Sequence, residues 1–493
     1  MRNSFLNARH FDRGMKRFLI WVSLLILSIV ILALLSPLRP GNTIISYTDS
    51  SVFQYIGSSM LDGAVPYRDV FDHKGPLIYF INCLGWMLHG ESGIWLIEVI
   101  SLTVCAILWF ELAYLVNGSN SASLLSSLLG LSAFILWIEG GNLTEEYCLP
   151  FLTTILLVYV ATIKTKKPVS FYFAFITGVS CAVVFLIKYN ALLFVIPLIS
   201  SELIKLHFDG SSFFKYACCG VIGFTLPTIA VAAWLFSNGA LEECFRDYFL
   251  FNLSYAGSAD LIHRLASLSG FANCSAVIAT FALLVISSFS GLLKHRWAII
   301  LFRGVLASFL IGFVSTSTTG YAFGHYALFF IPFIVVSFSV VPGLLCSYEY
   351  PIQRLISSLV IILMLVEFVF PSIETAMSQT MRSADSTANQ YILINQVRDR
   401  TSRGERIGIV GNSCWIYLHT ETVSASSIAY LPAGIVDFTP WFNSLHDDFE
   451  ESSPKLVLVA DYYVDSFCND SFLQKYSFIC NAHGFNVYEL RFS

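Results

Sequence analysis

The segment Tyr47–Phe80 reads YTDSSVFQYIGSSMLDGAVPYRDVFDHKGPLIYF and lies between two apolar parts of the chain. It gathers charged residues that are scarce elsewhere, namely Asp49, Arg68, Asp69, Asp72, His73 and Lys74. Only 12% of the 493 residues are charged, whereas about 25% is usual in soluble domains. A charged segment in so apolar a chain is the first candidate for chemistry.

The composition is that of an integral membrane protein, because 56% of the residues are hydrophobic. The formal net charge of −5 is small, and no run rich in lysine and arginine is present, which argues against nucleic-acid binding. The 12 cysteines show no CxxC or Cys/His metal spacing. A disulfide between Cys468 and Cys480 stays open if both lie outside the cytoplasm.

Apolar runs predict about eleven membrane-spanning helices. The first run covers 18–35 and follows a basic tail, and because it lacks a small-residue cleavage site we expect it to be retained. The other predicted spans lie near 93–116, 122–138, 147–163, 169–187, 189–204, 215–237, 271–291, 297–317, 321–341 and 355–371.

Basic residues between these runs predict the orientation of the chain. The loops expected in the cytoplasm carry Lys164, Lys166, Lys167, Lys205, Lys294, His295, Arg296 and Arg354. The distribution of these basic residues predicts a multi-pass protein of the cell membrane with its N-terminus in the cytoplasm. It places 37–92, 139–146, 238–270, 318–321 and all residues after Pro371 on the outer face.

The first outer loop, about 37–92, is expected to hold two helices at the membrane interface. In 50–62 the apolar residues recur at helical spacing with serine and glutamine between them. The run 76–90 opens with Gly75-Pro76 and is too short for a comfortable span.

The chain becomes more polar after Pro371. Residues 372–403 are expected to be helical, 406–411 and 455–460 to form buried strands, and 484–490 to form an edge strand. The predicted fold class is therefore an α-helical polytopic membrane protein, with a transmembrane domain over 1–371 and a small extracytoplasmic α/β domain over 372–493.

Asp49 has two interpretations. A carboxylate at the interface suits a general base for a hydroxyl, because partial burial favours proton uptake. Aspartate before a helical run is also a good N-cap, and Asp49-Ser50-Ser51 fits one. The two roles are compatible, since a cap fixes the position of the carboxylate.

Lys74 is the second candidate. At the start of a helix it can neutralise a lipid phosphate, and free backbone N–H groups of the first turn would assist. The alternative is a lysine that reaches to lipid headgroups. Its neighbours Asp72, His73 and Gly75-Pro76 favour the functional interpretation.

Further polar residues lie at predicted membrane edges. Glu145 and Glu146 could bind a metal, hold a sugar or cap a helix, and adjacent helical side chains diverge, so one of them is expected to face a site. Lys188 could bind an anionic headgroup or pair with an aspartate or glutamate, or it could extend to the membrane surface. The pair His325-Tyr326 is left open as ligand-binding or structural.

With these motifs, the chain resembles the polyprenyl-phosphate-sugar-dependent glycosyltransferases of the C-type fold. Within these, it looks more like the bacterial branch related to protein O-mannosyltransferases and to lipid A aminoarabinose transferases. The resemblance rests on Asp49 after the first span, on the turn from Gly63 to Asp69, and on Asp72-His73-Lys74-Gly75-Pro76. It covers about the first two hundred residues at the level of motifs and the whole chain at the level of topology.

The resemblance implies that Asp49 matches the acidic residue at the catalytic position of the family. It also implies that Lys74 matches the lysine that holds the lipid phosphate. Glu145 or Glu146 would match the acidic position of the second outer loop. The chain departs from the pattern in Asp49-Ser50, where many relatives have Asp-Glu, and in Lys-Gly-Pro instead of Lys-Pro-Pro. His73 replaces an acid that helps some relatives bind metal, so a divalent metal stays open as cofactor.

The predicted function is sugar transfer from a polyprenyl-phosphate donor to an acceptor hydroxyl of a glycan, lipid or protein, on the outer face of the bilayer and with inversion. Asp49 is the expected base, and Lys74, Arg68 and Lys188 are candidates for the donor phosphate. Asp72, His73, Glu145, Glu146, His325 and Tyr326 are candidates for acceptor or metal contacts. The alternatives are a transporter or flippase of a lipid-linked sugar or other anion, and a polymerase or ligase of surface polysaccharide.

Overall fold

A computed structural model describes most of the chain, namely residues 2–46, 49–164, 170–208, 213–258, 261–272, 275–289, 296–317, 323–341, 362, 365–432 and 437–491. Most of the predicted span 355–371 lies outside the described residues. So do the predicted cytoplasmic residues Lys166, Lys167, Lys294, His295 and Arg354.

The chain divides into two compact units. The helical unit contains 1–36, 96–232 and 256–378, and the mixed unit contains 37–95, 233–255 and 379–493. The mixed unit therefore combines the whole predicted first outer loop, 37–92, with the C-terminal residues. The boundary predicted at residue 371 stays a prediction.

Seven helical stretches within the described residues are long and apolar enough to cross a membrane, which agrees with a multi-pass membrane protein. They are Gly14–Leu35, Glu91–Asn117, Asn120–Trp137, Thr144–Lys164, Phe171–Phe194, Phe213–Ser237 and Trp297–Ser315. Two shorter apolar helices, Val277–Ser288 and Gly324–Phe338, coincide with predicted spans. The total of eleven and the orientation stay predictions.

The apolar helices are α1 (Arg2–Leu35), α4 (Glu91–Asn117), α5 (Asn120–Trp137), α6 (Thr144–Lys164), α7 (Phe171–Lys188), α8 (Ile196–Phe208), α9 (Phe213–Ser237), α13 (Ser275–Phe289), α14 (Arg296–Ser315) and α15 (Ile331–Phe338). Helix α6 contacts both α7 and α14, and α14 also contacts α8. Short turns link them: η2 (Tyr189–Phe194) continues from α7, η4 (Gly324–Phe330) precedes α15, and η5 is Leu365–Val369.

The link between α5 and α6 is a left-handed turn. Residues 139–142 all have positive φ, at 45° for Glu139, 94° for Gly140, 85° for Gly141 and 53° for Asn142. The backbone N–H of Asn142 donates to Oε1 of the buried Glu98 at 2.6 Å. This bond holds the turn that leads into α6, and therefore sets where the Glu145 side chain begins.

The mixed unit begins with α2 (Asp49–Ser59), η1 (Met60–Asp62) and α3 (Pro76–His89). Both expected helices are present, and Pro76 occupies the first turn of α3 after Gly75. Helix α2 differs from the prediction of an amphipathic surface helix, because Ser50, Ser51 and Gln54 are buried along with its apolar residues. The close approach of α3 explains this burial, since a Cβ on Gly57 would lie 2.6 Å from Asn82 Cβ.

Short helices lie between α9 and α13 and in the C-terminal part of the chain. They are α10 (Leu241–Cys244), η3 (Phe245–Leu250), α11 (Phe251–Ser258), α12 (Leu261–Ala272), α19 (Trp415–Thr420), η6 (Asp461–Tyr463), α21 (Val464–Phe467) and α22 (Asp470–Lys475). Two longer helices are α18 (Phe370–Arg398), which confirms the helix expected after residue 372, and α20 (Thr439–Ser452).

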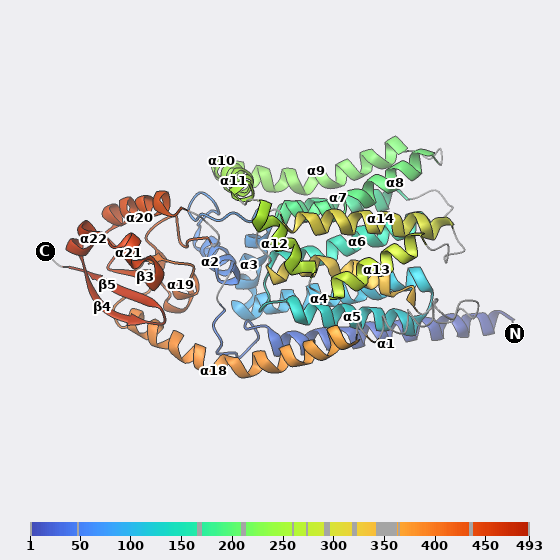
Figure 1. Cartoon of the computed structure of the whole chain (residues 1–493), viewed down its shortest axis with the longest axis horizontal. Helices are drawn as coiled ribbons and strands as arrows, with labels where there is room; N and C mark the ends of the chain where they lie inside the picture. The colour runs from blue at the N-terminus through green and yellow to red at the C-terminus, as the bar shows by residue number, and fades with distance from the viewer. Residues whose placement is uncertain are drawn as a thin grey trace. The chain divides into compact units, whose positions relative to one another are not determined.

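A five-stranded sheet in the order β2-β1-β3-β5-β4 confirms the predicted C-terminal α/β domain. The strands are β1 (Arg406–Val410), β2 (Val423–Ser424), β3 (Leu456–Ala460), β4 (Tyr476–Ala482) and β5 (Phe485–Leu490). Strand β1 pairs in parallel with β2 and β3, whereas β5 is antiparallel to β3 and β4. Helix α20 lies beside the sheet (Figure 1). Its Phe442, Leu445 and Phe449 belong to a buried core cluster that also contains Val457 and Val459 of β3.

One detail of the sequence analysis is corrected, and one question that it left open is answered. Strand β5 was expected at the edge of the sheet, but β4 pairs with its outer side, so β5 lies inside the sheet. Cys468 and Cys480 are both free thiols and form no disulfide.

Replacing Gly141 by alanine should destabilise the helical unit. Alanine at positive φ costs about 1–2 kcal/mol, and its Cβ would lie 2.2 Å from Glu98 Oε1, which adds about 1–3 kcal/mol of overpacking. Gly118→Ala is the matched control, because Gly118 also has positive φ but no atom within 4 Å of an added Cβ. Thermal unfolding in detergent should rank wild type above Gly118→Ala and Gly118→Ala above Gly141→Ala. Equal losses would contradict the role of the Glu98 contact.

The C-terminal domain should lose stability as the pH falls. Burial lowers the pKa of His419 to about 4, and Arg398 acts in the same direction. An unfolded histidine with a pKa of about 6.5 takes up a proton well before the folded one, so up to about 2 kcal/mol is lost between pH 7.5 and pH 5. Hydrogen exchange of α19 and β2 should accelerate at pH 5 beyond the intrinsic rate, and His419→Gln should remove most of this acceleration.

Candidate functional site

The predicted site residues fall into two clusters. One is in the mixed unit and contains Asp49, Arg68, Asp72, His73 and Lys74. The other is in the helical unit, where the described candidates are Glu145, Glu146, Lys188, His325 and Tyr326. Each cluster is described on its own.

Asp49 and Lys74 form an ion pair in the mixed unit. Asp49 is the first residue of α2, and Lys74 stands just before Gly75 and the start of α3. Oδ2 of Asp49 lies 3.4 Å from Nζ of Lys74. The Asp49 side chain is 39% exposed and that of Lys74 17%, so the pair is open to a ligand on the side of the carboxylate. The interpretation of Asp49 as the N-cap differs from the structure, because Asp49 is already the first residue of α2.

Behind this ion pair lies a buried carboxylate, that of Asp72. Tyr79 donates to its Oδ2 at 2.8 Å, and the backbone N–H of His73 donates to its Oδ1 at 2.6 Å. Tyr430, from the C-terminal domain, donates a further short hydrogen bond to Oδ1. Three donors on one buried carboxylate agree with the rule that a buried charged group must be hydrogen-bonded.

The electrostatics of Asp72 reflect its burial. Burial raises the pKa of Asp72 above its usual value, whereas the Lys74 ammonium and the hydrogen bonds from Tyr430 and Tyr79 act in the opposite direction. Burial also raises the pKa of Tyr430 well above its usual value. The phenol of Tyr430 therefore keeps its proton and acts as the donor.

His73 connects the buried carboxylate to the ion pair. Its Nε2 lies 2.9 Å from Lys74 Nζ, and its Nδ1 lies 3.5 Å from Asp72 Oδ1 and 3.4 Å from the Tyr430 hydroxyl. Because Lys74 Nζ can only donate, Nε2 accepts and the ring proton belongs on Nδ1, facing Asp72. The lysine ammonium is thus placed between a neutral imidazole and the Asp49 carboxylate.

Hydrogen bonds from near and distant residues hold the backbone of this segment. Tyr67 donates to the Lys74 carbonyl at 2.7 Å, and Asn252 donates to the His73 carbonyl at 2.6 Å. The N–H of Phe71 donates to the Ser427 carbonyl at 2.8 Å. These bonds restrict the peptide that carries Lys74 and so fix the origin of its side chain.

Arg68 lies in the same loop but is already paired. Its guanidinium donates to both oxygens of Asp69, at 2.9 and 2.7 Å, and to the Asn238 carbonyl at 2.8 Å. The Arg68–Asp69 hydrogen bond raises the pKa of Arg68 and lowers that of Asp69. Its predicted contact with a phosphate stays a prediction.

The second cluster is organised around Glu145, which is 1% exposed on the first turn of α6. Lys188, the last residue of α7, forms an ion pair with Glu145 Oε1. His325 Nε2 lies 3.8 Å from the same oxygen, and His325 Nδ1 lies 2.7 Å from Glu139 Oε2. Lys188 Nζ also lies 4.2 Å above the centre of the Tyr326 ring. Four of the predicted residues therefore lie together, in a cluster of carboxylates and cationic or aromatic side chains that Glu139 joins. The four are Glu145, Lys188, His325 and Tyr326.

Glu146 points elsewhere, as expected for the neighbour of Glu145 on a helix. It is 1% exposed, and neither carboxylate oxygen has a hydrogen bond of good geometry among the described residues. Glu98, in contrast, accepts from Asn142 and from Ser36 at 2.8 Å. The two glutamates belong to the packing around the turn at 139–142, away from Lys188.

A divalent metal does not fit the residues present. Among the described residues, no three His, Cys, Asp or Glu side chains gather closely enough to hold a metal ion. At His73, the Nε2 atom that would bind a metal faces the positively charged Lys74 ammonium at 2.9 Å. No chemical step is therefore derived through a metal.

The residues that sequence reasoning missed are Tyr430, Asn252, Tyr67 and Tyr79. Tyr67 and Tyr79 flank the charged motif, so their place within the segment was a usable signal. Tyr430 and Asn252 lie 357 and 179 residues from His73 in sequence, and nothing local marks them as its partners.

The chain shares its fold with two solved structures of ArnT from Cupriavidus metallidurans, one in the apo state and one bound to undecaprenyl phosphate. Both are 12% identical to this chain over 95% of its length and 97% of theirs, with TM-scores of 0.59 and 0.56. The oligosaccharyltransferase AglB from Archaeoglobus fulgidus, solved with an inhibitory peptide and a dolichol-phosphate, covers 90% of this chain and 69% of its own at 12% identity and a TM-score of 0.50. The predicted C-type glycosyltransferase fold is confirmed.

No curated protein sequence matches the chain. One family model does, that of the N-terminal domain of the putative competence-induced protein Ccs4, and its match covers residues 12–341. Because the match spans more than half of the 493 residues, the chain belongs to the family of the putative competence-induced protein Ccs4 N-terminal domain.

Proposed function

We propose that the chain is a membrane glycosyltransferase that moves a sugar from a polyprenyl-phosphate donor to an acceptor hydroxyl. The observation that carries the proposal is the 3.4 Å approach of Asp49 and Lys74 in a charged segment of an otherwise apolar chain. The fold shared with ArnT, which has been solved with undecaprenyl phosphate bound, supports the donor class.

In this mechanism Lys74 holds the donor phosphate. Its ammonium is held by Asp49 and by His73 Nε2, and the first turn of α3 begins immediately after it. Helix N-termini present free N–H groups and a partial positive charge to anions. The segment therefore offers a cation and a helix start for one phosphate.

Asp49 is the base. Its carboxylate takes the proton of the acceptor hydroxyl as that oxygen attacks the anomeric carbon from the face opposite the phosphate. The new bond joins the acceptor oxygen to the anomeric carbon, and the bond from that carbon to the phosphate oxygen breaks. The electron pair leaves with the polyprenyl phosphate, whose added negative charge Lys74 stabilises. Attack from the opposite face inverts the anomeric centre.

The C-terminal domain would take part through Tyr430. Its hydroxyl holds Asp72, Asp72 faces His73, and His73 contacts Lys74. Tyr430 is therefore a positioning residue for the donor-phosphate lysine. Sugar transfer on the outer face, with the C-terminal domain also outside, completes the proposal.

Substitutions at Asp49 and Lys74 should separate turnover from donor binding. Asp49→Asn keeps the shape of the side chain but removes the base, so kcat should fall about 10²- to 10⁴-fold with donor binding largely kept. Lys74→Met should weaken donor binding about 10- to 100-fold, since a hydrogen bond to a charged group contributes about 1.5–3 kcal/mol. The measurements are transfer of labelled sugar from a synthetic lipid donor by purified protein, and donor binding in nanodiscs.

Arg68→Met is the matched control for loss of a positive charge in the same loop, because Arg68 already has Asp69 as its partner. An equal loss of donor binding there would extend the phosphate contact to Arg68. Full activity of a folded Asp49→Asn variant would contradict the proposed role of Asp49 as the base. Passage of the lipid-linked sugar across sealed vesicles without covalent transfer would indicate a carrier instead of a transferase.

Tyr430→Phe should lower kcat about tenfold, since Asp72 loses a donor bond worth about 1.5–3 kcal/mol. Loss of that bond raises the pKa of Asp72 further, so the acidic limb of the rate–pH profile should move to higher pH. Tyr417→Phe is the control, because Tyr417 is another buried phenol of the same domain and donates to Ser424. A matching loss of kcat in Tyr417→Phe, with no shift of the profile in Tyr430→Phe, would leave Tyr430 with a structural role alone.

A further inference from the structure

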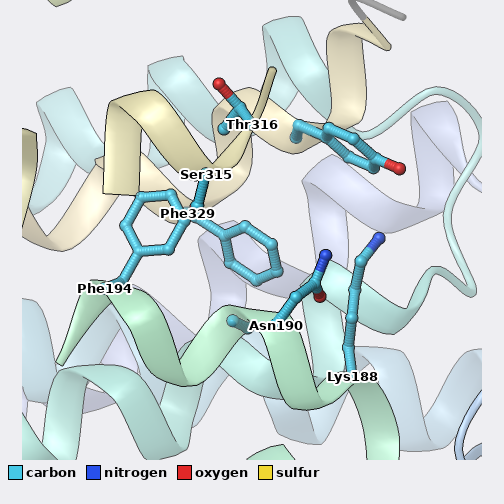
Figure 2. Close-up of a pocket in the computed structure, with 8 residues that line it drawn as sticks. Lys188, Asn190, Phe194, Ser315, Thr316 and Phe329 are labelled. Atoms are coloured by element: carbon cyan, nitrogen blue, oxygen red, sulfur yellow. The ribbon is translucent and has the colours of Figure 1, made fainter. Parts of the chain in front are cut away.

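The two lysines considered for the donor phosphate differ in the space beside them. Lys188 lines a pocket that has room for about one water molecule (Figure 2), and its ammonium is paired with the buried Glu145. A phosphate would have to break that pair, and separation leaves a buried charge without compensation. Lys74 is paired instead with Asp49, whose side chain is 39% exposed. The donor phosphate therefore has readier access to Lys74.

Donors hold the two backbone carbonyls next to the Lys74 side chain. The His73 carbonyl accepts from the amide of Asn252 at 2.6 Å. The Lys74 carbonyl accepts from the Tyr67 hydroxyl at 2.7 Å, and more weakly from that of Tyr79 at 3.3 Å. The oxygen is the negative end of the peptide dipole, so a carbonyl that turned toward a phosphate would repel it. These hydrogen bonds keep both oxygens directed at the protein.

The N–H groups of the same two peptides face the other way. No peptide bond in the described part of the chain is cis, and a planar trans peptide points its N–H and C=O in opposite directions. The N–H of Lys74 thus points away from Asn252, and that of Gly75 points away from Tyr67. The Gly75 N–H donates to no atom among the described residues. Fixing the two carbonyls therefore also fixes the direction of two backbone donors.

Asn252 is placed by a π-helical turn. In η3 the backbone is wound so that the Phe251 N–H donates to the Arg246 carbonyl, five residues back. The amide of Asn252 also donates to the Tyr248 carbonyl, at 2.8 Å, so both of its N–H groups are used. One residue corresponds to about 100° of rotation in an α-helix. A regular α-helix in place of η3 would therefore turn Asn252 away from His73, and π turns are frequent at functional sites.

Tyr67 is placed by a strained backbone. Its φ is 71°, in the left-handed region that bulky residues rarely adopt. Its N–H donates to the Val70 carbonyl at 2.8 Å and its side chain is buried, so the turn and the packing maintain this conformation. Strain of this kind collects at active sites and ligand clamps. Both residues that hold the Lys74 peptides are thus supported by uncommon backbone geometry.

We propose that Asn252 and Tyr67 are positioning residues for the binding of the donor phosphate. They hold the carbonyls before and after the Lys74 side chain, and so keep the N–H side of both peptides available to the phosphate that Lys74 binds. They act through the backbone and take no part in proton transfer. The inference rests on the proposed function, and it adds that the segment 241–258 is needed for donor binding.

Removal of either donor should weaken the binding of polyprenyl phosphate to the full chain in nanodiscs. Asn252→Leu and Tyr67→Phe nearly keep the size of the side chain and add no charge. Each releases one carbonyl, so ligand binding has to restore the orientation of that peptide, and Kd should rise about 3- to 10-fold. In the transfer assay KM for the donor should rise likewise, whereas kcat at saturating donor should stay within about twofold of wild type, because the base Asp49 is unchanged.

Two substitutions are matched controls within the mixed unit. Asn238→Leu removes an amide that donates at 2.8 Å to the carbonyl four residues before it. Tyr476→Phe removes a phenol hydroxyl that donates to the Pro454 carbonyl at 3.1 Å. Both lose a bond from a side chain to the backbone away from Lys74, and both should bind polyprenyl phosphate as wild type does. Thermal unfolding shows which variants are folded, and Tyr67→Phe tests the proposal by itself if Asn252→Leu does not fold.

The proposal is overturned if wild type does not bind polyprenyl phosphate, if Asn252→Leu and Tyr67→Phe bind it as wild type does, or if the controls lose as much affinity. A loss in kcat alone would also overturn it. Its failure is distinct from failure of the proposed function. Weaker polyprenyl phosphate binding in both variants, without any sugar transfer by wild type, keeps the positioning role and removes the transferase. Sugar transfer by wild type, with unchanged KM in both variants, keeps the transferase and removes the positioning role.

Discussion

The buried carboxylate of Asp72 is the interaction on which the mixed unit depends. It joins the charged loop to α3 through Tyr79 and to the C-terminal domain through Tyr430. A buried carboxylate without donors would cost several kcal/mol, so these elements have to stay together for the loop to keep this shape. The position of the Lys74 ammonium follows, because His73 faces Asp72 on one side and Lys74 on the other.

Each cluster contains a lysine ammonium paired with a carboxylate, but the two ion pairs differ in their exposure to solvent. Asp49 and Lys74 form a partly exposed pair, whereas Glu145 is almost fully buried against Lys188. An exposed pair exchanges partners at little cost, since surface ion pairs contribute about 0–1 kcal/mol. A buried pair resists exchange, because separation leaves a charge without compensation.

The elements of the fold were largely predictable because their signals are local. Long apolar runs, the Gly75-Pro76 helix start and the apolar strands β1 and β3 each depend on a few adjacent residues. Strand β4 was missed because its exposed and buried residues do not alternate strictly, and a register shift interrupts its pairing with β5. The burial of polar residues on α2 was also missed, since it arises from the approach of α3 at Gly57.

The sequence by itself determined that the chain is a membrane protein, that charged residues gather around Asp49 and Lys74, and that Glu145, Lys188 and His325 are polar residues in apolar surroundings. These conclusions follow from composition and from neighbours along the chain. Only the tertiary structure decided which of these residues pair with one another. Tyr430 reaches Asp72 across 358 residues, and Lys188 meets Glu145 across 43. Hydrogen bonds and ion pairs depend on distances of about 3 Å in space, and sequence separation carries no information on such distances once the chain has folded back on itself.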